Sequence, residues 1–152
     1  MDGDPLLIAI YLVSVVILVF LNGFFVAAEF AMVKVRPGRI DSLALEGNIR
    51  ARYAQRILGN LNAYLSACQL GITLASLALG WIGEPAVAEL IRPVLGFLPD
   101  FVIHTVSFII AFSIITTFHI TLGEQVPKTY AIRHPESVTL LAAIPMAIVY
   151  KL

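Results

Sequence analysis

The sequence predicts an all-α membrane protein with three transmembrane helices, short cytoplasmic amphipathic helices and a juxtamembrane helix. Of its 152 residues, 59% are hydrophobic and only 13% are charged, which is far from the composition of a soluble domain. Three windows contain no Asp, Glu, Lys or Arg: residues 5–28, 57–83 and 101–123. Each window exceeds the roughly 20 helical residues that cross a hydrocarbon core. We therefore expect membrane spans at about 5–32, 60–83 and 100–124.

A fourth uncharged stretch, residues 137–150, is shorter and contains Pro145. It predicts a juxtamembrane helix at about 135–152 that lies at the interface or is partly inserted, and a fourth span is the alternative. The chain ends directly after this stretch with no soluble tail, so we expect the sequence to be a piece of a longer protein.

The distribution of basic residues predicts the orientation of the spans. The segment between the first two spans contains Lys34, Arg36, Arg39, Arg50, Arg52 and Arg56 against three carboxylates. The positive-inside rule places this segment in the cytoplasm. The segment at 81–100 is acidic, and basic residues return after the third span. Both observations predict an N-terminus outside and a C-terminus in the cytoplasm.

The cytoplasmic segment 37–59 has apolar residues at helical spacing with arginines on the opposite side. It predicts two short amphipathic helices that are interrupted near Gly47-Asn48 and lie on the inner leaflet. The residues expected on the apolar side are Ile40, Leu43, Ala44, Ala51, Ala54, Gln55 and Leu58. A solvated basic loop held by anionic lipid explains the charges equally well.

Polar side chains inside the spans are expected to face one another, because an unpartnered carboxylate at the bilayer centre costs roughly 3 kcal/mol. The topology brings the polar ends of the three spans to a comparable depth, so they can converge in the inner half of the membrane. Their oxygen atoms suit a hard cation such as Mg²⁺ or Na⁺. The predicted metal ligands are Glu124, Gly123, Asn22, Ser66, Gln69, Gly71 and Thr73. Glu124 would supply the negative charge, and Gly123 and Pro127 are expected to break the helix around it.

Simpler structural roles compete with several of these assignments. Asn22 and Gln69 could hydrogen-bond each other and fix the bundle. Ser76 is expected to bond back to its own helix, and His119 to pack as an ordinary buried histidine. Glu29 is expected to form an interfacial ion pair with the basic residues that follow it.

Several functional classes are excluded or disfavoured. The formal net charge is zero, so the chain lacks the global basic field of a nucleic-acid-binding protein. Its single cysteine, Cys68, excludes an intrachain disulfide and a multi-cysteine metal cluster. The sequence contains no nucleophile and base pair, phosphate loop or metalloprotease spacing, so we do not expect an enzyme.

Three segments resemble the transmembrane domain of the CorC/CNNM family: NGFFVAAEFA (22–31), LSACQLGITLASLALGWIGEP (65–85) and LGEQVPKTYAI (122–132). The resemblance covers nearly the whole chain, 1–152. Its most specific piece is the Gly-Glu-x-x-Pro-Lys motif after a hydrophobic span, and Gln-Leu-Gly-Ile-Thr resembles a bacterial branch often labelled haemolysin-like. The resemblance implies a homodimer in the bacterial inner membrane, with cytoplasmic CBS domains outside this chain. It also implies Mg²⁺ export, exchanged against Na⁺.

The resemblance further implies an ion held by a serine of the first span, an asparagine and a carbonyl of the second, and the Gly-Glu of the third. Gly123 and Glu124 match this pattern, whereas Val26 and Ile72 occupy the serine and asparagine positions and the carbonyl position falls near Cys68. Either neighbouring polar residues substitute, with Asn22, Ser66, Gln69 and Thr73 as candidates, or the cation retains more water. Two other functions stay open: a non-transporting membrane regulator or scaffold, and a transporter of another cation such as a polyamine.

Overall fold

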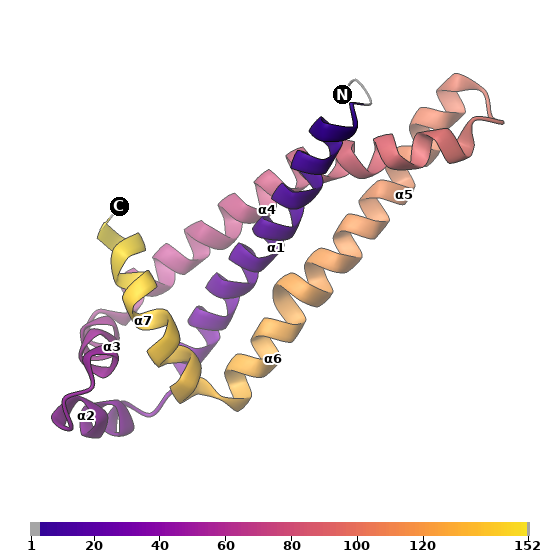
Figure 1. Cartoon of the computed structure of the whole chain (residues 1–152). Helices are drawn as coiled ribbons and strands as arrows, with labels where there is room; N and C mark the ends of the chain where they lie inside the picture. The colour runs from indigo at the N-terminus through magenta and orange to yellow at the C-terminus, as the bar shows by residue number, and fades with distance from the viewer. Residues whose placement is uncertain (1–3, 152) are drawn as a thin grey trace.

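The computed structural model describes residues 4–151, and every regular element in that range is helical. Figure 1 shows three long helical segments, with the shorter helices gathered at one end. The helices are α1 (Pro5–Lys34), α2 (Pro37–Leu45), α3 (Ile49–Gly59), α4 (Leu61–Ile91), α5 (Asp100–Ile120), α6 (Val126–Arg133) and α7 (Pro135–Lys151). A 3₁₀ turn (Arg92–Leu95) follows α4, and a π turn (Thr121–Gln125) joins α5 to α6.

Three segments are long and apolar enough to cross a membrane: Pro5–Lys34, Leu61–Leu95 and Asp100–Arg133. The predicted all-α class with three spans is therefore confirmed. The second helix continues to Ile91, past the expected end at 83, because its interior Pro85 does not interrupt it. Helix α7 occupies the region of the expected juxtamembrane helix and continues through Pro145, while residue 152 lies outside the described residues.

The first helix begins and ends where local chemistry dictates. The Asp4 side chain accepts a hydrogen bond of 3.0 Å from the Leu6 amide, and Pro5 occupies the first turn, where its missing N–H has no intrahelical partner to lose. At the other end Val35 is extended, and Pro37 opens the next helix. Between these ends α1 packs against α4, α6 and α7, so it is the central helix of the fold.

The third span differs from the sequence-based expectation of a helix broken around Gly123 and Pro127. The helix instead changes its hydrogen-bonding pattern and continues to Arg133. The Val126 amide bonds to the Thr121 carbonyl, five residues earlier, which is the pattern of a π turn. Pro127 is tolerated because it lies in the first turn of α6.

Helices α2 and α3 form as predicted and are separated at Gly47, whose φ of 91° favours glycine. Much of their apolar surface packs against protein, while Leu45 and Ile49 stay exposed; the predicted contact with the inner leaflet stays a prediction. Ile40, Ala51 and Ala54 are fully buried in a core that includes residues of α1, α4 and α7. Gln55, expected on the apolar side, is exposed and donates a hydrogen bond to Asp41. The partner surface comes from α7, which packs against α3.

Candidate functional site

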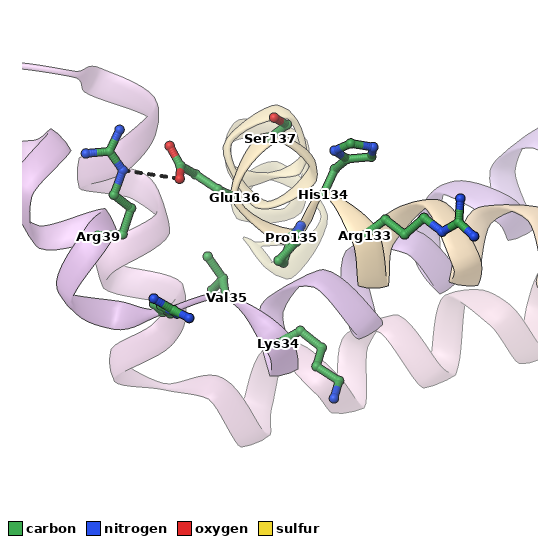
Figure 2. Close-up of a pocket in the computed structure, with 9 residues that line it drawn as sticks. Lys34, Val35, Arg39, Arg133, His134, Pro135, Glu136 and Ser137 are labelled. Atoms are coloured by element: carbon green, nitrogen blue, oxygen red, sulfur yellow. Dashed lines mark hydrogen bonds and ion pairs between the residues drawn. The ribbon is translucent and has the colours of Figure 1, made fainter.

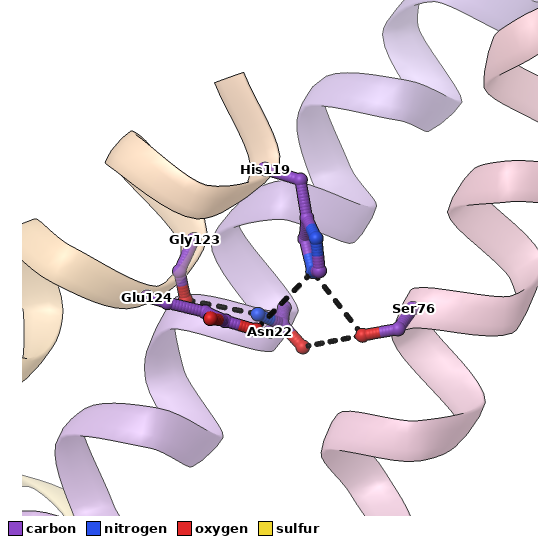
Figure 3. A network of polar contacts seen from close by, with 5 residues as sticks. All are labelled: Asn22, Ser76, His119, Gly123 and Glu124. Carbon is purple, nitrogen blue, oxygen red and sulfur yellow. Dashed lines mark hydrogen bonds and ion pairs between the residues drawn. The ribbon is translucent and has the colours of Figure 1, made fainter. Parts of the chain in front are cut away.

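A network of polar contacts joins the three long segments in the interior of the fold (Figure 3). It consists of Asn22 from α1, Ser76 from α4, His119 from α5, and Gly123 and Glu124 from the π turn. Asn22 is fully buried, and its Nδ2 donates a hydrogen bond of 2.9 Å to the carbonyl oxygen of Gly123. This bond ties the middle of the first span to the irregular part of the third.

The carbonyl of Gly123 is available to Asn22 because of the local sequence. In an α-helix it would accept from the amide four residues later, but that residue is Pro127, which has no N–H. Gly123 is also confined, because a Cβ there would lie 3.1 Å from Asn22 Nδ2 and 3.3 Å from His119 Cδ2. On α1, Gly23 permits a similarly close approach, since its Cβ would lie 3.0 Å from Pro127 Cγ.

Ser76 extends the network from Asn22 to His119. Its Oγ lies 3.3 Å from Asn22 Oδ1 and 3.1 Å from His119 Nε2. A hydroxyl has only one proton, so Ser76 can donate to one of these neighbours at a time. When it donates to Asn22, His119 must donate to Ser76 through a protonated Nε2. The hydrogen-bond direction therefore links the Asn22 amide to the protonation of His119 at Nε2.

Glu124 is the only carboxylate of the network, and it is more exposed than its neighbour His119. Its Oε1 lies 3.9 Å from His119 Nε2, and the two side chains are 42% and 19% exposed. The network thus extends from the fully buried Asn22 to the partly exposed Glu124. Within residues 4–151 no group of three or more His, Cys, Asp or Glu is placed to hold a metal ion. A cation bound here would depend on Glu124 together with neutral oxygen atoms.

The neutral oxygens already have partners in this arrangement. The Gly123 carbonyl accepts from the Asn22 amide nitrogen, and Asn22 Oδ1 accepts from Ser76. A half-turn of the Asn22 amide about its Cβ–Cγ bond would exchange its oxygen and nitrogen. Both Asn22 Oδ1 and the Gly123 carbonyl could then face one cation, and the amide nitrogen would face Ser76.

A second polar pair joins α1 and α4 outside this network. Gln69 Nε2 donates to Glu29 Oε1 at a position seven residues from the Asn22–Ser76 contact on both helices. The two pairs therefore share one antiparallel register. The sequence left open a hydrogen bond between Asn22 and Gln69 and predicted an ion pair for Glu29. In the structure Gln69 bonds to Glu29 instead, and Asn22 bonds to Gly123 and Ser76.

An apolar layer lies between the two polar pairs. The same register sets Val26 opposite Ile72, and neither side chain has a polar atom. Next to them the Phe25 ring covers Gly71, where a Cβ would lie 2.6 to 2.7 Å from three ring atoms. Gly71 thus has a packing role in this structure. Two of the positions at which the family resemblance implies ion ligands, those of Val26 and Ile72, belong to this apolar layer, whereas Gly123 and Glu124 lie in the polar network.

Three of the seven predicted ligands come together in the structure, namely Asn22, Gly123 and Glu124. Ser66 is exposed and bonds back to the Asn62 carbonyl of its own helix, and Thr73 is exposed on α4. Sequence reasoning did not select Ser76 or His119. The spacing of residues along the helices could have identified both. His119 precedes Gly123 by one helical turn and therefore lies on the same side of the helix. Ser76 follows Gln69 by seven residues, which is also the spacing between Asn22 and Glu29.

Comparisons with known proteins agree with this architecture. Residues 13–152 match the CNNM family, described as the cyclin M transmembrane N-terminal domain. The chain is 51% identical to the UPF0053 protein YhdT of Bacillus subtilis (strain 168), over 93% of this chain and 31% of that protein. It is 43% identical to YhdP of the same strain, over 93% of this chain and 32% of the relative, and 41% identical to YugS, over 96% and 34%. The chain therefore spans about a third of the length of these curated relatives. With three helices able to span a membrane and a match along nearly its whole length, the chain belongs to the CNNM family of multi-pass membrane proteins.

Proposed function

We propose that this chain exports Mg²⁺ across the membrane in exchange for Na⁺, and that the ion binds at the Asn22–Glu124 network. The observation that carries the proposal is a carboxylate, Glu124, in a π turn within a membrane span, next to a carbonyl that has lost its α-helical donor. Ionisable groups inside spans are costly and are retained mainly for function. Irregular backbone at this depth is typical of transporter binding sites.

In the proposed ion-bound state, Mg²⁺ contacts the Glu124 carboxylate, the Gly123 carbonyl and Asn22 Oδ1. Water completes the octahedral shell, because Mg²⁺ dehydrates reluctantly. The Asn22 amide rotates when the ion arrives, which moves its donor away from Gly123. Protonation of Glu124, or replacement of Mg²⁺ by Na⁺, weakens divalent binding and allows release. Alternating access would expose the site in turn to the side of α2 and α3 and to the side of the 3₁₀ turn.

The wider assembly is also part of the proposal. The basic residues around α2 and the acidic segment after α4 support a cytoplasmic location for α2, α3 and the C-terminus. The family membership supports a bacterial inner-membrane homodimer whose longer chain includes CBS domains.

Mg²⁺ binding to the purified chain tests the site. Calorimetry should give saturable binding for the unchanged chain and for Glu46→Gln, which removes an exposed carboxylate at the end of α2. Glu124→Gln should lose at least about tenfold in affinity, because a charged ligand becomes neutral. Mg²⁺ efflux from liposomes should follow the same order. Equal binding by Glu124→Gln and Glu46→Gln would contradict the site.

Two other candidates make different predictions. The apolar Val26 and Ile72 and the single carboxylate favour a less strongly hydrated cation such as a polyamine, whose ammonium groups donate hydrogen bonds to the same oxygens. Competition by putrescine with no Mg²⁺ binding would support this candidate. A membrane regulator or scaffold would bind cations in liposomes and move none of them.

A further inference from the structure

A hollow of about 520 Å³ lies where four helix ends meet (Figure 2), and none of its lining residues belongs to the polar network. The ends of α1 and α6 and the beginnings of α2 and α7 form it. Its charged lining residues are Lys34, Arg36, Arg39, Arg133 and Glu136. Arg133 and Glu136 come from a segment about a hundred residues after Lys34, Arg36 and Arg39, so only the fold places the two sets around one hollow.

The hollow is strongly positive, although the chain as a whole has no net charge. The whole sequence has ten Lys and Arg and ten Asp and Glu, yet four of the cations and one of the carboxylates line this hollow. The carboxylate, Glu136, pairs with Arg39 through Nε at 3.2 Å. The guanidinium of Arg39 keeps its terminal amino groups for another acceptor. With His134 neutral, the hollow has a net charge of three positive units.

Two helix N-termini add to this positive potential. Helix α2 begins at Pro37, directly after Arg36, and α7 begins at Pro135, directly after His134. Arg36, at the N-cap of α2, makes no side-chain capping bond. The amides of a helical first turn lack intrahelical acceptors and favour anions. The backbone therefore reinforces the side chains at the same place.

The position of the hollow indicates which kind of anion is available to bind there. Lys34 is the last residue of the first apolar span and Arg133 the last of the third, so the hollow lies at the end of both spans, beyond their uncharged stretches and on the headgroup side of the hydrocarbon. Phosphate is the anionic group concentrated at that depth, and arginine binds it through paired hydrogen bonds. We propose that this hollow binds a phosphate group, supplied by the headgroup of an anionic phospholipid. The inference rests on the membrane placement of the chain and is independent of cation transport.

Two double variants with equal charge loss test the site. Arg36→Gln/Arg133→Gln alters the hollow, and Arg50→Gln/Arg52→Gln removes two exposed arginines of α3 that do not line it. Each purified protein is placed in phosphatidylcholine nanodiscs with increasing phosphatidylglycerol, and bound phosphatidylglycerol is counted by native mass spectrometry. We expect saturable binding that is at least about tenfold weaker in the first variant, because it removes two charge-assisted hydrogen-bond donors to the phosphate. The second variant should bind like the unchanged chain.

Equal weakening in both variants would overturn the site, because it would indicate general surface charge, and so would unchanged binding in both. Inorganic phosphate titrated into pure phosphatidylcholine nanodiscs distinguishes the two sources of phosphate. Saturable binding of inorganic phosphate without preference for phosphatidylglycerol would overturn the lipid as source. If the first variant does not fold, the single change Lys34→Gln at the exposed end of α1 gives the same comparison against Arg50→Gln.

Discussion

At the scale of single residues, the chemistry of Asn22 explains why an amide occupies the centre of the site. The position needs a donor for the Gly123 carbonyl and an acceptor for the Ser76 hydroxyl, and one amide supplies both. An aspartate would direct a carboxylate oxygen at a carbonyl oxygen. A leucine would leave the polar atoms of both neighbours without their partner.

Asn22→Leu should therefore destabilise the fold by about 1–3 kcal/mol, since it leaves a buried carbonyl and hydroxyl without this partner. Thermal or denaturant unfolding in micelles measures the change. Ser14→Ala is the matched control, because the Ser14 hydroxyl bonds only to the Ile10 carbonyl of its own helix, at 2.8 Å, and its loss should have little effect. Similar stability of the two variants would mean that the Asn22–Gly123 bond contributes no stability.

At the scale of helices, the irregular π turn leaves a backbone carbonyl free to bond to a residue on a different helix. Pro127 removes the donor that Gly123 would otherwise use, and Asn22, a hundred and one residues away, supplies another. A π turn inside a helix is uncommon and is often found at functional sites.

Pro127→Ala should make the fold less dependent on Asn22, because it restores a backbone N–H that can bond to Gly123. A double-mutant cycle with Asn22→Leu tests this coupling. We expect the loss caused by Asn22→Leu to fall by about 0.5–1.5 kcal/mol in the Pro127→Ala background, the typical net value of one hydrogen bond. Strict additivity would show that Pro127 does not control the acceptor.

Two glycines of α4 provide a second prediction at the same scale. A Cβ at Gly71 would lie 2.6 Å from the Phe25 ring, whereas a Cβ at Gly80 would meet nothing within 4 Å. Gly71→Ala should cost about 1–3 kcal/mol through overpacking of the α1–α4 interface. Gly80→Ala should be neutral or stabilising by up to about 1 kcal/mol, since alanine favours the helix. Phe25→Leu should relieve the Gly71→Ala defect, and failure to do so would place the clash elsewhere.

The elements also show which features a sequence can predict. Windows without charge identified the three spans, and Gly47-Asn48 identified the break between α2 and α3, because both signals are local. Pro127 was misread as a helix end, since its neighbours do not reveal a π turn. Ser76 and His119 were missed for a different reason. Their partners depend on the register between helices, and a Ser or His in a span usually has only a packing role.

At the scale of the whole molecule, the main hydrophobic core lies at one end of the helical bundle. The main buried cluster joins residues of α1, α2, α3, α4 and α7 around Ile40, Ile57 and Met146. Along the other half of the spans, large apolar side chains such as Phe20, Phe112 and Trp81 are exposed, as expected where lipid or a second copy covers a helix. Helix α7 therefore determines whether the membrane helices and the short helices form one unit.

The rate at which Cys68 reacts with a thiol reagent reports whether α7 stays packed against α4. Cys68 is the only cysteine, it is fully buried, and its Sγ lies 4.0 Å from the Sδ of Met146 on α7. In micelles a maleimide should label the folded chain only when α7 moves away. Met146→Ala removes the covering side chain and should accelerate labelling by at least about tenfold, because truncation of a buried methionine costs about 2–5 kcal/mol. Ile148→Ala, at a position 59% exposed on the same helix, should label like the unchanged chain. If the unchanged chain labelled as fast as Met146→Ala, α7 would not be held against α4, and the buried cluster would not unite the membrane helices with α2 and α3.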